Sequence, residues 1–122
     1  MNSHYKTLDL DKILQLLADQ PSIDDAKDLA LSLEPQFELE KVKKLLKQTD
    51  DAVVLSGKYG TPSFGGAKNC ANALRRAEAG GCLSTGELLQ IAETLRIIRS
   101  VKEWHSKFAS TETTLDGYFS GL

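Results

Sequence analysis

Residues 74–99, which read LRRAEAGGCLSTGELLQIAETLRIIR, constrain the fold of this chain more than any other stretch. Gly80 and Gly81 can adopt the left-handed backbone conformation that ends a helix. Ser84 and Glu87 stand three residues apart, which is the spacing of a capping box at the start of a helix. We therefore expect two helices to meet at a fixed corner whose geometry these four residues set.

Apolar residues recur at helical spacing through the rest of the chain. The pattern indicates an all-α fold, a compact bundle of about five or six helices. We expect these helices over residues 10–19, 22–34, 38–56, 68–79 and 85–108, with a last short helix near 115–119. Asp9 is the expected N-cap of the first helix. The third helix is expected to bury Leu39, Val42, Leu45, Leu46, Ala52 and Val53.

The composition is that of a soluble globular protein, because 41% of the 122 residues are hydrophobic and 26% are charged. A net charge of -2 and a pI of about 5.7 argue against a dedicated nucleic-acid-binding domain. The chain shows neither a signal peptide nor an apolar run that could cross a membrane, so we expect a cytoplasmic protein. We assign residues 1–108 to one helical core-type domain. Residues 109–122 should form a polar turn and a short C-terminal helix that ends at the edge of a fragment.

The glycine-rich stretch GKYGTPSFGG, residues 57–66, invites comparison with a phosphate-binding P-loop. Gly66 and Ala67 stand where that motif needs a lysine and a hydroxyl residue, so we expect no nucleotide here. Gly65 and Gly66 should instead form a tight connection, with Phe64 inserted into the core.

No catalytic constellation is evident, because the two histidines, His4 and His105, are isolated in the sequence. Cys70 and Cys82 lack the spacing of a metal site and are expected to be buried free thiols. We therefore predict no catalytic, cofactor-binding or metal-binding residue in this chain.

Six basic residues are candidate nucleic-acid contacts. Four lie on the third predicted helix and two at the end of the fourth: Lys41, Lys43, Lys44, Lys47, Arg75 and Arg76. The favoured alternative is structural. The lysines alternate with acidic residues as on a solvated helix face, and the arginines suit the negative end of a helix dipole.

The long predicted helix over residues 85–108 has two apolar faces. One face comprises Leu88, Ile91, Ala92, Leu95 and Ile98, which we expect to be buried. A candidate protein interface lies on nearly the opposite face: Ile97, Val101, Trp104 and Phe108. The alternative is that Tyr118, Phe119 and Leu122 cover this second face within the same chain.

Several stretches of the chain resemble the N-terminal region of the MutS-II family, the second bacterial branch of MutS proteins, which carries an Smr nuclease domain. They are, in the family's order, LDLDKIL, AKDLALSLEP, QTDDA, GTPSFGGAKN and RAEAGGCLSTGELLQIAETLR. Together they cover most of residues 8–108. The resemblance implies that the chain is half of a MutS-type core domain.

The resemblance also implies a function for the longer protein. MutS-II proteins are homodimeric ATPases that use ATP and magnesium, bind DNA, suppress recombination, and in some bacteria act on stalled ribosomes. Their Walker and Smr motifs have no counterpart in these residues, so the segment would be a non-catalytic base between the lever and clamp helices and the ATPase head. The alternative is a free-standing helical adaptor for protein–protein interaction.

Overall fold

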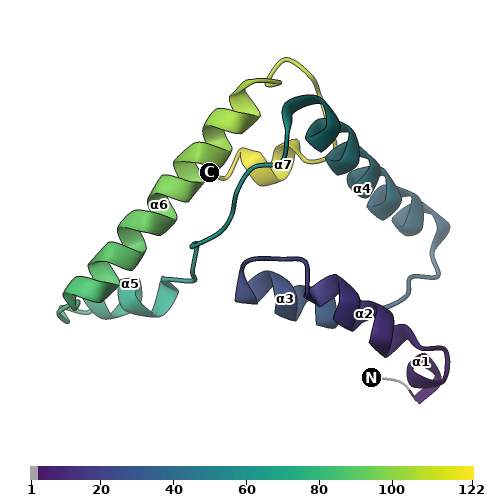
Figure 1. Ribbon diagram of the computed structural model, residues 1–122, viewed down its shortest axis with the longest axis horizontal. Helices are drawn as coiled ribbons and strands as arrows, with labels where there is room; N and C mark the ends of the chain where they lie inside the picture. Colours follow the sequence, from purple (N-terminus) through teal and green to yellow (C-terminus); the bar gives the residue numbers. More distant parts are fainter. Residues whose placement is uncertain (1–2) are drawn as a thin grey trace. The chain divides into compact units, whose positions relative to one another are not determined.

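The computed structural model describes residues 3–122, and the described part of the chain contains seven helices and no strand (Figure 1). The all-α fold class predicted from the sequence is therefore confirmed. The helices are α1 (Ser3–Thr7), α2 (Leu10–Ala18), α3 (Asp24–Leu31), α4 (Leu39–Tyr59), α5 (Ala71–Glu78), α6 (Thr85–Ser106) and α7 (Asp116–Phe119). Helix α1 was not expected from the hydrophobic pattern, whereas each of the others overlaps a predicted helix.

Asp9 does not cap α2 with its side chain, contrary to the expectation. Its backbone is left-handed, with φ at 60°, and its side chain makes no cap hydrogen bond. Instead, the N–H groups of Leu8 and Asp9 donate to the carbonyls of His4 and Lys6. These two residues thus close the end of α1, and an aspartate tolerates the left-handed conformation there.

Helix α5 begins at Ala71, three residues later than the pattern predicts. The backbone before Ala71 binds α6 rather than continuing the helix, since the Lys68 N–H donates to Thr94 Oγ1 at 3.2 Å. Asn69 then accepts the Ala71 N–H on its side-chain oxygen at 2.9 Å. This bond supplies a partner for one of the unpaired donors at a helix start.

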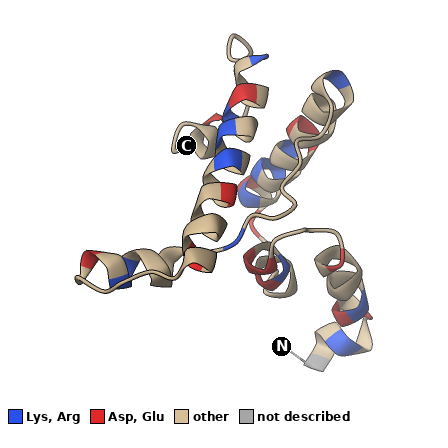
Figure 2. Cartoon of the chain, turned by 60° about the vertical axis from the view of Figure 1, so that its left-hand side comes forward, with Lys and Arg blue, Asp and Glu red and all other residues tan. Residues whose placement is uncertain are grey.

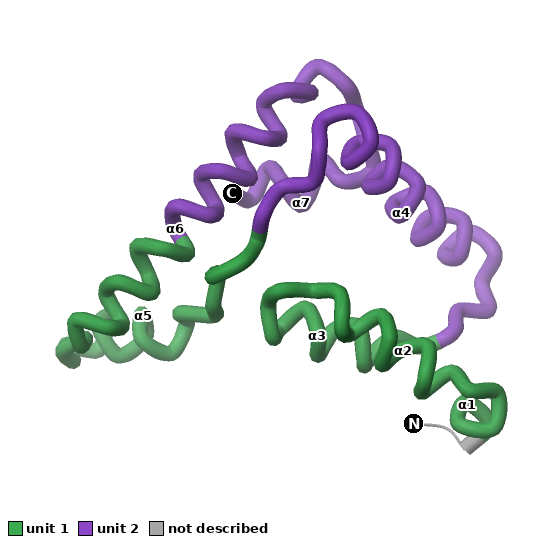
Figure 3. Tube along the Cα trace, viewed as in Figure 1, with its two compact units in different colours: residues 1–34, 64–94 green, residues 35–63, 95–122 purple. Residues whose placement is uncertain are grey.

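The chain divides into two compact units, each made of two separate stretches (Figure 3). Unit 1 takes the chain up to Glu34 together with residues 64–94, and unit 2 takes residues 35–63 and 95–122. Helix α6 gives its first half to unit 1 and its second half to unit 2. This division does not coincide with the predicted boundary after residue 108, which stays a prediction.

The core of unit 2 is aromatic. Phe108 is almost fully buried, and its ring lies 5.0 Å from that of Tyr59 and 4.8 Å from that of Trp104. Leu55 of α4 is also buried, as are two residues of α6 on the same face as Phe108, namely Ile97 and Val101. In unit 1 the buried apolar residues lie on α2 and α3: Leu14, Ala18 and Ala30.

Most residues expected to be buried on the two long helices are instead exposed, although Val42, Ile91 and Ile98 are half-buried. Leu39, Leu46 and Val53 of α4 keep 64%, 65% and 66% of their surface accessible, and Leu88 and Leu95 of α6 are exposed too. Hydrophobic periodicity identified the apolar stripes of both helices correctly. It did not show which stripe would be buried. The bulky aromatic side chains, which bury the most area, lie on the second face of α6.

Two smaller expectations about burial are also wrong. Phe64 does not insert into a core but remains 41% exposed. Of the two cysteines, Cys82 is exposed and Cys70 is only partly buried, although both are free as predicted.

Candidate functional site

The corner between α5 and α6 is built as its sequence suggests. The Glu87 N–H donates to Ser84 Oγ at 3.2 Å, and the Ser84 N–H donates back to Glu87 Oε1 at 3.5 Å. Gly80 has a φ of +87°, and the Gly81 N–H donates to the carbonyl of Arg76 at 2.8 Å. The corner is therefore fixed by backbone and capping bonds.

The two arginines of α5 have partners inside unit 1. The Arg76 guanidinium pairs with the Glu87 carboxylate across the corner, and Arg75 Nη1 donates to the Asn72 side chain at 3.2 Å. Glu87 thus serves both the capping box and this ion pair. The role of these arginines toward nucleic acid stays a prediction.

The glycine-rich loop is held against α6 by two polar residues that the sequence reasoning missed. Gln90 donates from its side chain to the Gly66 carbonyl at 2.9 Å, and Gly66 has a φ of +92°. Thr94 binds the backbone N–H of Lys68, as described above. Gln90 and Thr94 lie four residues apart on α6 and therefore on one face of the helix. This pair of polar residues was the sequence feature that could have predicted a contact with the loop.

A cleft of about 300 Å³ lies beside this loop in unit 1. Backbone and side chains of residues 22–25 and 66–69 line it, and Asn69 donates to the Asp25 carboxylate at 2.8 Å across it. Asp24, Asp25 and Lys68 all line the cleft, so its wall carries charges of both signs.

The lysines predicted as nucleic-acid contacts lie on α4, and all four are exposed: Lys41, Lys43, Lys44 and Lys47. Lys43 Nζ lies 3.8 Å from Glu40, and Lys47 Nζ lies 2.9 Å from Asp51. Figure 2 shows that both long helices carry acidic as well as basic residues. Part of this positive charge is therefore neutralised locally, and a nucleic-acid contact stays a prediction.

The four residues predicted as a protein interface pack within unit 2: Ile97, Val101, Trp104 and Phe108. Phe119 of α7 contributes to their cover, with its ring 5.9 Å from that of Trp104. Tyr118 and Leu122, named with it as possible covers, remain exposed. Intrachain packing occupies this face, and its role as an interface stays a prediction.

Trp104 also closes the end of α4. Its indole Nε1 donates to the carbonyls of Tyr59 and Gly60, at 3.2 Å and 2.8 Å. The last carbonyls of a helix lack intrahelical donors, so this side chain satisfies groups that α4 cannot pair itself. Trp104 therefore joins α6 to α4 through both its ring and its N–H group.

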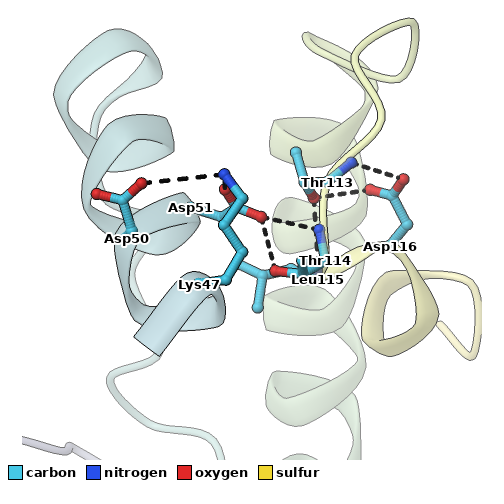
Figure 4. Close-up of polar contacts among 7 residues, drawn as sticks. All are labelled: Lys47, Asp50, Asp51, Thr113, Thr114, Leu115 and Asp116. Carbon is cyan, nitrogen blue, oxygen red and sulfur yellow. Dashed lines mark hydrogen bonds and ion pairs between the residues drawn. The ribbon is translucent and has the colours of Figure 1, made fainter. Parts of the chain in front are cut away.

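One polar cluster centres on Asp51, the one buried charged residue among those described (Figure 4). Its Oδ2 accepts the Thr114 N–H at 2.9 Å and the Thr114 hydroxyl at 2.6 Å. Its Oδ1 lies 2.9 Å from Lys47 Nζ. Asp51 thus ties the turn before α7 to the middle of α4. We call this cluster the Asp51 latch.

The turn itself is held by a second carboxylate. Asp116 accepts the Thr113 N–H at 3.0 Å and the Thr113 hydroxyl at 2.9 Å. Nε2 of His105 on α6 lies 3.9 Å from the same carboxylate. The turn is therefore held at Thr113 by Asp116 and at Thr114 by Asp51.

These contacts lower the pKa of both acids. The Lys47 ammonium and the two Thr114 donors lower the pKa of Asp51 to about 2. The Thr113 donors lower the pKa of Asp116 in the same way. Both sets of contacts therefore favour the ionised form of the carboxylate in the folded chain.

The Asp51 latch thus holds two backbone segments together through hydrogen bonds and an ion pair. No group of three potential metal ligands occurs within residues 3–122. Within the same part of the chain, no helix combines the length and the apolar character needed to cross a membrane.

Known proteins with similar sequences give the chain its context. Endonuclease MutS2 of Acetivibrio thermocellus is 37% identical over 101 residues, which is 83% of this chain. Endonuclease MutS2 of Agathobacter rectalis is 36% identical over 97% of it, and that of Ruminiclostridium cellulolyticum is 36% identical over 80%. This chain matches a segment of MutS2. The resemblance predicted from the sequence is thereby confirmed.

The match to MutS2 is confined to a small part of those proteins. The chain spans 12–15% of the length of the curated relatives named above. No protein-family model and no solved structure matches it. The MutS2 likeness therefore rests on sequence comparison with individual proteins.

Proposed function

We propose that this chain is the non-catalytic N-terminal core segment of a MutS2-type protein. In this role it is a helical base that joins the lever and clamp helices to an ATPase head. One observation carries the proposal: the chain matches MutS2 proteins over 80–97% of its own length but only 12–15% of theirs. A segment of this kind supplies geometry, while the chemistry belongs to other parts of the chain.

The arrangement of polar side chains supports a mechanical role. The capping box, the Gln90 bond to the glycine loop and the Asp51 latch all fasten one backbone stretch to another. Rigid joints of this kind transmit motion between domains, because packed elements move as bodies rather than deform continuously.

The longer protein would act as a homodimer that uses ATP and Mg²⁺ in the cytoplasm. Its target would be DNA, where it suppresses recombination, or a stalled ribosome. Exposed apolar residues such as Leu46 and Leu95 would then pack against the rest of the same chain.

Sequencing the source gene tests the proposal directly. We expect the open reading frame to continue beyond the codon for Leu122 into Walker and Smr motifs. A stop codon directly after Leu122 would contradict it. As a biochemical check, the 122-residue chain should hydrolyse neither ATP nor DNA, whereas the longer product should hydrolyse ATP.

The second candidate is a free-standing helical adaptor that binds a protein partner. The exposed apolar residues of α4 and α6 favour it, since patches of this kind mark protein-binding surfaces. The same sequencing result separates the two functions, because an adaptor needs no continuation of the reading frame.

A further inference from the structure

The last residues of unit 2 lie over part of its aromatic cluster. We call residues 113–122 the strap, which contains α7 and follows the exposed residues 109–112. Within the strap, Phe119 places its ring 4.5 Å from that of His105 and 5.9 Å from that of Trp104. The strap therefore covers one side of both rings at the end of α6.

Little apolar surface holds the strap in place. No residue of α7 is buried, and Tyr118 and Leu122 keep 68% and 41% of their surface accessible. The backbone N–H of Tyr118 donates to Leu115, and that of Ser120 donates to Asp116, so these bonds stay within the strap. They add nothing to its attachment to α4 or α6. A helix as short as α7 is also unstable by itself.

Polar contacts supply most of the attachment instead (Figure 4). The Asp51 latch holds the Thr114 N–H at 2.9 Å and the Thr114 hydroxyl at 2.6 Å. On α6, Nε2 of His105 lies 3.9 Å from the Asp116 carboxylate, which is a longer contact. Short hydrogen bonds to an ionised group are stronger than such a contact, so the attachment depends chiefly on Asp51.

The aromatic cluster beneath the strap has packing partners of its own. The ring of Phe108 lies 5.0 Å from that of Tyr59 and 4.8 Å from that of Trp104. The Trp104 indole also donates to the Gly60 carbonyl at the end of α4. These contacts join α4 to α6 without the strap. Releasing the strap should therefore cost much less free energy than unfolding unit 2.

We propose that the strap opens and closes over the aromatic cluster while the rest of unit 2 stays folded, and that the Asp51 latch sets how often it opens. The closed strap is a rigid part of unit 2. Opening uncovers Trp104 and His105 and leaves α4 and α6 joined by their own contacts. The strap lies within unit 2 and does not depend on the MutS2-type function, so the two proposals fail independently.

Amide hydrogen exchange of the 122-residue chain, followed by NMR at several low urea concentrations, tests the strap. The amides of Thr114 and Tyr118 should exchange about a hundred-fold faster than those of residues 97–101 in the core of unit 2. The rates at Thr114 and Tyr118 should rise little with urea, because opening exposes little surface. The rates of the core amides should rise steeply, because they exchange when unit 2 unfolds.

Substitutions test the part played by the latch. Asp51→Asn removes its charge and should speed exchange at Tyr118 about ten-fold. Thr114→Val removes one of the two donors from the strap and should speed the same exchange by a smaller factor. Asp50→Asn is the matched control and should leave the rate unchanged, because Asp50 contacts Lys47 on its own helix instead of the strap.

Circular dichroism establishes that each variant keeps its helices. The proposal is overturned if Tyr118 of the wild-type chain exchanges at the rate, and with the urea dependence, of residues 97–101. The strap would then open only when unit 2 unfolds. It is equally overturned if Asp50→Asn speeds the exchange at Tyr118 as much as Asp51→Asn does.

Discussion

At the scale of single residues, Asp51 shows how one carboxylate can fix a distant part of the chain. It stands 63 positions before Thr114, yet accepts both its N–H and its hydroxyl. No local pattern marks it, since its neighbour Asp50 is also an aspartate and yet is mostly exposed. Only the fold distinguishes the two aspartates.

Replacing Asp51 by asparagine should lower the thermal midpoint of unfolding. The variant loses the charge that pairs with Lys47 and weakens the bonds to Thr114. Asp50→Asn is the control and should change the midpoint little, because its contact with Lys47 is 4.0 Å long. Equal effects of the two substitutions would argue against the Asp51 latch.

The pKa of Asp51 predicts how acid affects stability. Its folded pKa of about 2 lies below its ordinary value of 3.8, so the folded state favours the ionised form. This contribution is complete above pH 3.8 and is lost as the pH falls through about 2. Urea unfolding of wild type and Asp51→Asn across this window should converge at the acid end. A difference that stays constant with pH would contradict the prediction.

Replacing Gly81 or Gly57 by alanine should change the stability of the chain in opposite directions. A Cβ on Gly81 would lie 2.8 Å from the Arg76 carbonyl oxygen, so Gly81→Ala should destabilise the chain by about 1–3 kcal/mol. Gly57 lies inside α4 with open space around it, so Gly57→Ala should stabilise by about 0.5–1 kcal/mol. Urea midpoints measure both, and a neutral Gly81→Ala would show that the corner is loose.

At the scale of helices, the sequence identified which segments are helical but not which side each helix buries. Helix α6 presents aliphatic residues on one face and aromatic residues on the other. The aromatic face is buried because Trp104 and Phe108 reach Tyr59 and Phe119 across unit 2. Hydrophobic periodicity weights both faces alike, so the outcome depended on partners far along the chain.

Substitutions at this aromatic cluster separate packing from hydrogen bonding. Phe108→Ala should cost about 3–5 kcal/mol of unfolding free energy, because Phe108 is almost fully buried. Trp104→Phe keeps an aromatic ring but loses the bonds to the end of α4, and should cost about 1 kcal/mol. Tyr118→Ala, on the exposed side of α7, should change stability by less than about 0.5 kcal/mol. Comparable losses from all three would contradict the observed packing.

At the scale of the whole molecule, the chain leaves many large apolar side chains exposed, among them Leu46, Leu88 and Leu95. A segment that matches 12–15% of its MutS2 relatives would meet further chain on such surfaces. If the proposed function holds, we expect these surfaces to be covered within the longer protein.

Cysteine labelling measures whether the exposed face of α6 is covered in the longer protein. In a background with Cys70 and Cys82 replaced by serine, Leu95→Cys should react with a maleimide quickly in the 122-residue chain. We expect its rate to fall about ten-fold or more in the longer protein, because packing excludes the reagent. Lys107→Cys is the exposed control and should react alike in both. Equal Leu95→Cys rates would show that this face stays uncovered.

The sequence by itself determined every described helix except α1, as well as the glycine corner and the MutS2 likeness. Each depends on residues close together in the chain: a 3.6-residue period, a cap three residues from its partner, or a run of matching letters. Tertiary structure alone decided that Asp51 would hold Thr114, that Gln90 would hold the glycine loop, and which face of α6 would be buried. These contacts join positions 15 to 63 residues apart, and no local pattern encodes which distant groups will meet.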